Sequence, residues 1–220
     1  MAYYSSGNGI QRTAPVVFNL IIINVIVFIA QQVFDTRTGF SLSDKLAIHG
    51  YQSEFFEPYQ LVTNMFAHGG IGHIFFNMFN LYVFGAWLER VWGPKRFLFF
   101  YLACGLVAGA VEMLVLKDFL YIDPSTGASE IIPGGAYGAS GAIMGLFAAF
   151  AYLFPNTPLY MMFIPVPVKA KYVVMVMVAL DLFGQFGPYK TGIAHFAHLA
   201  GLVTGFIIVI FWRKNRKTFY

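Results

Sequence analysis

A few polar side chains stand in otherwise apolar stretches of the sequence. Ser140 lies in GGAYGASGAIMG (134–145), His198 in AHLAGLVTG, and His73 and Asn77 in HIFFNMFN. A serine hydroxyl is a weak nucleophile and needs a base such as a neutral imidazole within hydrogen-bond reach. Imidazole and amide N–H groups can donate to the oxyanion that forms when serine attacks a carbonyl. These residue types predict acyl transfer, provided that the fold brings them together.

The segments that carry these residues are apolar enough to be membrane spans. Of the 220 residues, 58% are hydrophobic and 11% are charged, whereas a soluble domain carries about 25% charged residues. Each apolar segment is close to the length that crosses a ~30 Å hydrocarbon core as a helix. The six segments are 16–33, 71–88, 97–116, 138–154, 172–186 and 192–212. We therefore expect an all-α integral membrane protein, a bundle of six transmembrane helices.

The charges in the connecting loops predict the orientation of this bundle. Basic residues gather in the turn at 89–96, before the fifth segment and in the tail, and acidic residues dominate the first and third loops. This alternation follows the positive-inside rule. It predicts a cytoplasmic tail at 1–15, one domain at 16–212 and a basic cytoplasmic tail at 213–220. The net charge of +4 is thus explained by topology, so we expect contact with lipid and no nucleic acid. A compact core without an organelle-targeting segment favours a bacterial plasma membrane.

The predicted orientation brings the polar residues to a common depth. The second, fourth and sixth segments all run inward, and each carries its polar residues near the outer end. His73, Asn77 and Asn80 recur at i, i+4 and i+7, so they share one helix face. Polar residues within membrane spans are costly and are candidates for function. Their convergence favours a site near the outer surface.

Helix packing is the alternative interpretation of the serine motif. Gly141 and Gly145 form a G-x-x-x-G pair, as do Gly201 and Gly205, and small residues at this spacing let helices approach closely. The serine is not in a G-x-S-x-G elbow, because residue 142 is alanine. On the motif alone, packing is favoured. Packing and catalysis remain compatible, since His198 shares a helix face with Gly201 and Gly205.

Three further glycines precede the serine, namely Gly134, Gly135 and Gly138. Because glycine has no side chain, they could let the backbone approach the position of an oxyanion.

The other ionisable residues suggest weaker hypotheses. A metal site of His195 and His198 with His68 and His73 is disfavoured, because no carboxylate cluster is near and Cys104 lies in another segment. No metal or cofactor is expected.

Two residues are given no role in the site. Asp181 could orient a histidine, but we favour its placement at the outer end of the fifth helix, since its spacing shows no link to His198. His49 is interpreted as a loop residue.

Four motifs resemble the signatures of the rhomboid intramembrane serine proteases. They are HGGIGHIFFN at 68–77, ERVWG at 89–93, GASG at 138–141 and AHLAGLVTG at 197–205. The resemblance implies that Ser140 is the nucleophile and His198 the base of a dyad without an acidic third member. It assigns oxyanion stabilisation to His73 and Asn77. It also implies structural roles for Glu89 and Gly93.

The sequence departs from the family pattern at two places. Tyr59 and Gln60 replace a frequent Trp-Arg pair, and Met144 stands where some members have a tyrosine that stacks on the histidine. The resemblance implies an intramembrane endopeptidase that cleaves transmembrane proteins near the outer face. The alternative is a non-catalytic rhomboid-like protein that binds transmembrane helices.

Overall fold

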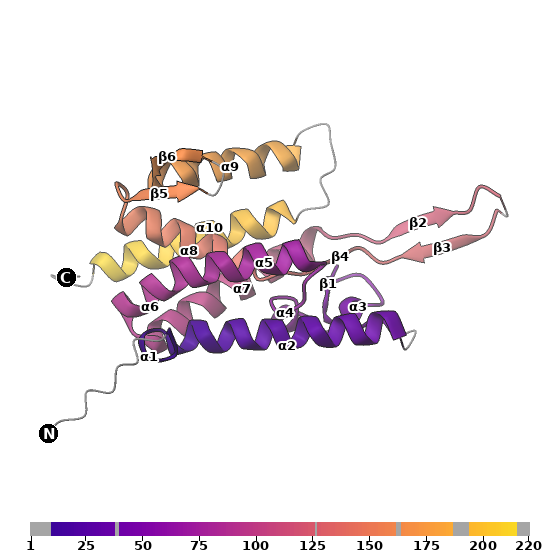
Figure 1. Cartoon of the computed structure of the whole chain (residues 1–220). Coiled ribbons are helices and arrows are strands. Elements are labelled where there is room, and N and C mark those ends of the chain that lie inside the picture. The colour runs from indigo at the N-terminus through magenta and orange to yellow at the C-terminus, as the bar shows by residue number, and fades with distance from the viewer. Residues whose placement is uncertain (1–9, 38–39, 126, 162–163, 187–193, 215–220) are drawn as a thin grey trace, which may run out of the picture.

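Long helices packed side by side form the body of the protein (Figure 1). The computed structural model describes residues 10–37, 40–125, 127–161, 164–186 and 194–214, so most of the two expected tails lies outside the described residues. Four of the described helices are long and apolar enough to cross a membrane. They are α2 (Pro15–Arg37), the continuous helix Ile71–Trp92, α7 (Pro94–Val115) and α10 (His195–Lys214). The expected class, a helical membrane protein, is confirmed.

All six predicted segments coincide with helices to within about one helical turn. The second is built from α5 (Ile71–Asn80), the π-helical turn η1 (Leu81–Gly85) and α6 (Ala86–Trp92). The fourth and fifth are shorter, with 14 residues in α8 (Ser140–Leu153) and 17 in α9 (Ala170–Phe186). The count of six spans stays a prediction.

Short antiparallel ladders join the helices, a feature that the all-helical prediction omitted. They pair β1 (Ile48–His49) with β4 (Gly135–Ala136), β2 (Phe119–Ile122) with β3 (Ser129–Ile132), and β5 (Pro158–Met161) with β6 (Ile164–Lys169). Pairing satisfies the backbone groups of these connections. The β2–β3 hairpin projects from the end of the bundle opposite to α1 (Ile10–Thr13) and the C-terminal end of α10 (Figure 1). Two further helices are short. In the chain, α3 (Leu42–Leu46) lies between α2 and β1, and α4 (Gln60–Thr63) lies between β1 and α5.

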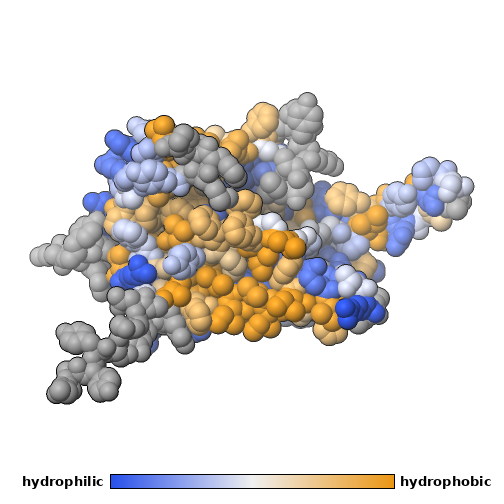
Figure 2. Space-filling view, viewed as in Figure 1, coloured by the Kyte–Doolittle hydropathy of each residue, from blue (hydrophilic) through white to orange (hydrophobic). Residues whose placement is uncertain are grey.

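Helix α8 forms the centre of the bundle, and α2 lies at its edge. Every residue of α8 from Gly141 to Phe150 is buried. In contrast, α2 exposes large aliphatic side chains such as Ile26 and Ile29, which are 60% and 58% exposed. Figure 2 shows these hydrophobic side chains as a band along α2. A patch of this kind is the surface expected to face lipid.

Glu89 ties the start of α2 to the second long helix. Its buried carboxylate accepts hydrogen bonds from the backbone N–H groups of Val16 and Val17, at 2.9 Å each. These N–H groups have no partner within α2, because they lie in its first turn. Gly93 follows with φ of +80° and separates α6 from α7. A positive φ favours glycine at this turn.

Replacing Glu89 tests this contact. We expect Glu89→Gln to lower the free energy of unfolding by about 1.5–3 kcal/mol, because a charge-assisted hydrogen bond to buried N–H groups is lost. Thermal unfolding in detergent measures the change. Glu130→Gln, which removes an exposed carboxylate on β3, is the control. Equal stability of both variants would contradict the role of Glu89.

Candidate active site

Ser140 and His198 come together from two different helices. Ser140 is the first residue of α8, and His198 lies in the first turn of α10. The distance from His198 Nε2 to Ser140 Oγ is 2.7 Å, which is a hydrogen bond. Both side chains are half-buried, so the pair is reachable from outside the bundle.

Glycines on α10 let the two helices approach closely enough for this contact. A Cβ on Gly201 would overlap the carbonyl oxygen of Gly141, and a Cβ on Gly205 would lie 2.6 Å from the Cα of Gly145. The backbones of α8 and α10 are therefore in direct contact, as small residues at G-x-x-x-G spacing allow. The serine–histidine pair lies at the end of the same interface.

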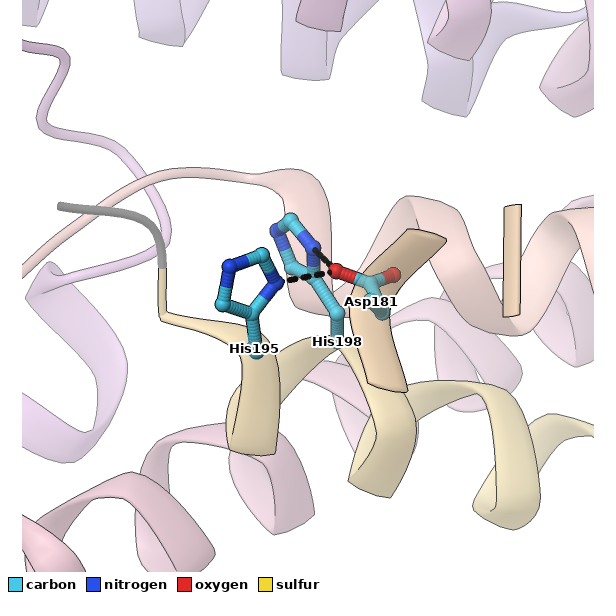
Figure 3. Close-up of side chains that lie close together, drawn as sticks. All are labelled: Asp181, His195 and His198. Atoms are coloured by element: carbon cyan, nitrogen blue, oxygen red, sulfur yellow. Dashed lines mark hydrogen bonds and ion pairs between the residues drawn. The ribbon is translucent and has the colours of Figure 1, made fainter. Parts of the chain in front are cut away.

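The second nitrogen of the His198 ring contacts Asp181 on α9. His198 Nδ1 lies 3.0 Å from Asp181 Oδ1, and His195 Nδ1 lies 2.6 Å from the same oxygen (Figure 3). The spacing of Asp181 and His198 in the sequence shows no link between them, so this contact is a correction to the expected placement of Asp181 outside the site. Sequence spacing could not reveal the contact, because α9 and α10 meet only in the folded bundle. A lone carboxylate in an apolar segment was the available signal.

This cluster also bears on the hypothesis of a metal site. Among the described residues, ligand atoms of Asp181, His195 and His198 lie within 4.8 Å of one another. A single carboxylate, Asp181, therefore lies beside the two histidines, although the sequence showed no carboxylate cluster near them. However, zinc bonds of about 2.0–2.1 Å in a tetrahedral site place ligand atoms more than about 3 Å apart. The 2.6 Å contact between His195 and Asp181 is shorter than this separation, and both imidazoles are hydrogen-bonded to the carboxylate.

His73 faces the serine across the space left by Gly138. The N–H of Gly69 donates to His73 Nδ1 at 3.2 Å, so the neutral ring carries its proton on Nε2. A Cβ on Gly138 would lie 2.9 Å from this Nε2 and 3.5 Å from Ser140 Oγ. Gly138 also has φ of +140°, which disfavours other residues. The position therefore stays open between a donor and the hydroxyl.

Asn77 and Asn80 differ although they follow His73 on the same helix. Asn77 is buried, and its Nδ2 has no hydrogen-bond partner among the described residues. The amide of Asn80 donates instead to the carbonyl of Phe76 on its own helix. Asn77 thus keeps a free donor, whereas that of Asn80 is already satisfied.

Two of the three glycines before Ser140 do not border the position of the oxyanion, contrary to what was predicted for them. A Cβ on Gly134 would overlap the carbonyl of Lys117, and a Cβ on Gly135 would lie 3.2 Å from the ring of His49. Packing against Lys117 requires glycine at position 134, and Gly135 packs closely against His49. Gly138 alone of the three borders His73 and the serine. His49 is not a simple loop residue, because its buried ring lies within 3.1 Å of the carbonyls of Gly134 and Asp44.

Glu112, a buried carboxylate on α7, was not among the residues expected at the site. Its Oε2 accepts a hydrogen bond of 3.0 Å from the backbone N–H of Ala197. Ala197 lies in the first turn of α10, where N–H groups have no partner within the helix. Glu112 and Ser140 also line the same small pocket. The carboxylate thus holds the start of α10, next to His198.

The fold and this site define a class of protein, a helical membrane bundle with a hydrogen-bonded serine–histidine pair near one end. The family model described as Rhomboid domain matches residues 56–215. The chain belongs to the rhomboid family, which includes intramembrane serine proteases that act on membrane proteins.

Similar proteins occur in plants and bacteria. RHOMBOID-like protein 12, mitochondrial, of Arabidopsis thaliana is 30% identical over 92% of this chain and 59% of its own length. Putative rhomboid protease YdcA of Bacillus subtilis (strain 168) is 26% identical over 84% of this chain and 78% of its own. Rhomboid protease GluP of the same organism is 30% identical over 68% of this chain and 25% of its own length. The chain thus spans little more than half of the first of these relatives.

These relatives correct one expectation. One of these relatives is named as a mitochondrial protein, and others come from a bacterium. The comparisons therefore do not support the predicted bacterial plasma membrane, and what holds is a multi-pass membrane protein.

The glycine interface predicts a cost for any added side chain. We expect Gly201→Ala to lower the free energy of unfolding by about 1–3 kcal/mol, because its Cβ would force α8 and α10 apart. Thermal unfolding in detergent measures the loss. In the control Gly72→Ala, the new Cβ on α5 meets no atom within 4 Å, so stability should be unchanged or higher. A stable Gly201→Ala protein would contradict the close contact.

Proposed function

We propose that this protein is a serine endopeptidase that hydrolyses peptide bonds of transmembrane protein substrates within the membrane. Ser140 is the nucleophile and His198 the general base. The observation that carries the proposal is the 2.7 Å hydrogen bond between Ser140 Oγ and His198 Nε2. Membership of a family with intramembrane serine proteases supports it.

The proposed reaction follows from the chemistry of this pair. His198 Nε2 accepts the proton of the Ser140 hydroxyl as Oγ attacks the carbonyl carbon of the substrate. The imidazolium then donates this proton to the leaving amine, and an ester on Ser140 remains. A water molecule, deprotonated by the same nitrogen, hydrolyses the ester and restores the serine.

The developing oxyanion requires donors, and three sources are available. His73 carries its proton on Nε2, which faces the open position at Gly138. Backbone N–H groups in the first turn of α8 have no partner within that helix. The Asn77 amide is buried without a partner among the described residues. Preorganised donors of this kind stabilise a tetrahedral intermediate.

The site's position suggests where the substrate is cut. The serine starts α8 at the end of the bundle from which the β2–β3 hairpin projects, opposite to the C-terminal end of α10 (Figure 1). With both termini cytoplasmic, as the loop charges predict, cleavage occurs near the outer face. A substrate helix must unwind locally, because its hydrogen-bonded backbone is otherwise closed to attack.

Removal of either reacting group tests the proposal. We expect Ser140→Ala and His198→Ala each to abolish cleavage of a model transmembrane substrate while the fold is retained. A fluorophosphonate probe should label the wild-type protein and leave Ser140→Ala unlabelled. Full cleavage by either variant would refute the catalytic pair. An unlabelled, inactive wild-type protein would favour the alternative, a rhomboid-like protein that binds transmembrane helices.

Three variants on α5 test the assignment of oxyanion stabilisation to His73 and Asn77. His73→Ala and Asn77→Ala should each lower kcat by about 10²-fold or more, since each removes a donor to the oxyanion. Asn80→Ala is the matched control, because that amide is already bonded to Phe76 on its own helix. If His73→Ala and Asn77→Ala both match Asn80→Ala in kcat, the two residues have no such role.

A further inference from the structure

We propose that Asp181 is a positioning residue for His198, so that the site works as a series of Ser140, His198 and Asp181. This inference rests on the proposed function and goes beyond the dyad that the resemblance implies. In it, the carboxylate selects the tautomer of the base and balances the charge that the base acquires.

Hydrogen bonding determines where the protons of the cluster lie. An ionised carboxylate only accepts hydrogen bonds, so the nitrogens 3.0 Å and 2.6 Å from Asp181 Oδ1 both carry protons. Both are Nδ1 atoms, of His198 and His195 (Figure 3). A neutral His198 with its proton on Nδ1 has a lone pair on Nε2. That lone pair faces Ser140 Oγ and can take the hydroxyl proton.

Asp181 is also one of the few buried side chains of α9. The buried residues of α9 are Ala170, at its first position, and Asp181. Apolar neighbours of Asp181 point outward, with Leu180 and Leu182 63% and 43% exposed. A carboxylate buried in a membrane bundle is costly unless it is paired. Its pairing with two histidines of α10 offsets this cost and also attaches the outer half of α9 to the site.

His195 keeps the carboxylate in place from the other side. Its ring is buried, and a Cβ on Gly184 would overlap its Nε2. The ring is therefore confined between Gly184 and Asp181. Glu112 does not take this role, since its carboxylate bonds to the backbone N–H of Ala197. Among the described residues, Asp181 supplies the carboxylate that the His198 ring contacts.

The position of Met144 fits this arrangement. Met144 is buried in α8, at the position where the resemblance implies, for some members, a tyrosine that stacks on the histidine. A methionine sulfur is only a weak hydrogen-bond acceptor, so it does little to hold an imidazole in one orientation. In this chain, the bond from His198 Nδ1 to Asp181 supplies the orientation instead.

The test uses the full chain in detergent, with Asp181→Asn, Asp181→Glu and the control Gln185→Ala. Gln185 lies one turn after Asp181 on α9. We expect Asp181→Asn to lower kcat and the rate constant of labelling by a small fluorophosphonate by about 10²-fold or more. KM should stay near that of the wild type, because the side-chain volume is preserved. The unfolding temperature should fall as it does for Glu89→Gln, because charge-assisted hydrogen bonds to a buried carboxylate are lost. Asp181→Glu should recover part of the rate, and Gln185→Ala should match the wild type.

A measurement on the unchanged protein covers the case in which a variant does not fold. In ¹⁵N-histidine NMR, the His198 signal, identified by its loss in His198→Ala, should show a protonated Nδ1 and an unprotonated Nε2. A proton on Nε2 would overturn the proposal. So would an Asp181→Asn protein that is labelled as fast as the wild type, while Ser140→Ala stays unlabelled. In that case the dyad would stand without Asp181. Failure of the proposed function is distinct, because the wild-type protein itself would then not be labelled.

Discussion

The direct backbone contact between α8 and α10 is the constraint on which the site depends. Gly201 and Gly205 leave room for the backbone of α8, so the carbonyl of Gly141 occupies the place of a Cβ on Gly201. A Cβ on Gly141 or Gly145 would first meet Ala108 or Cys104 of α7, so these two glycines also let α7 approach. At this separation the first residue of α8 reaches the first turn of α10, and a 2.7 Å hydrogen bond forms between Ser140 and His198. Helix packing and the candidate chemistry are two consequences of one interface.

Three buried carboxylates of the bundle each accept hydrogen bonds from a helix that begins beside them. Glu89 bonds to N–H groups at the start of α2, and Glu112 bonds to one at the start of α10. Asp181 accepts from two imidazoles in the first turn of α10. A buried polar group without a partner costs more than a single hydrogen bond gains. Pairing therefore makes these charges tolerable and also determines where α2 and α10 begin.

The helices and motifs could be predicted because they depend on local patterns. Apolar runs of spanning length located the helices to within about a turn, and the G-x-x-x-G spacing indicated which faces are small. The β2–β3 and β5–β6 hairpins lie in segments that were interpreted as loops, whereas the β1–β4 ladder was missed because it pairs residues far apart in the chain. For the same reason Gly134 and Gly135 were assigned to the oxyanion, although their space is filled by Lys117 and His49.

The sequence by itself determined the class of protein, its family resemblance and the residue types available for chemistry, because composition and motif spacing are properties of the chain alone. Only the tertiary structure decided which ionisable groups meet. Asp181 and His198 lie on different helices, and no periodicity relates residues across a helix boundary. Their contact depends on how α9 packs against α10. The buried carboxylate, paired with two imidazoles, favours one specific packing of these helices.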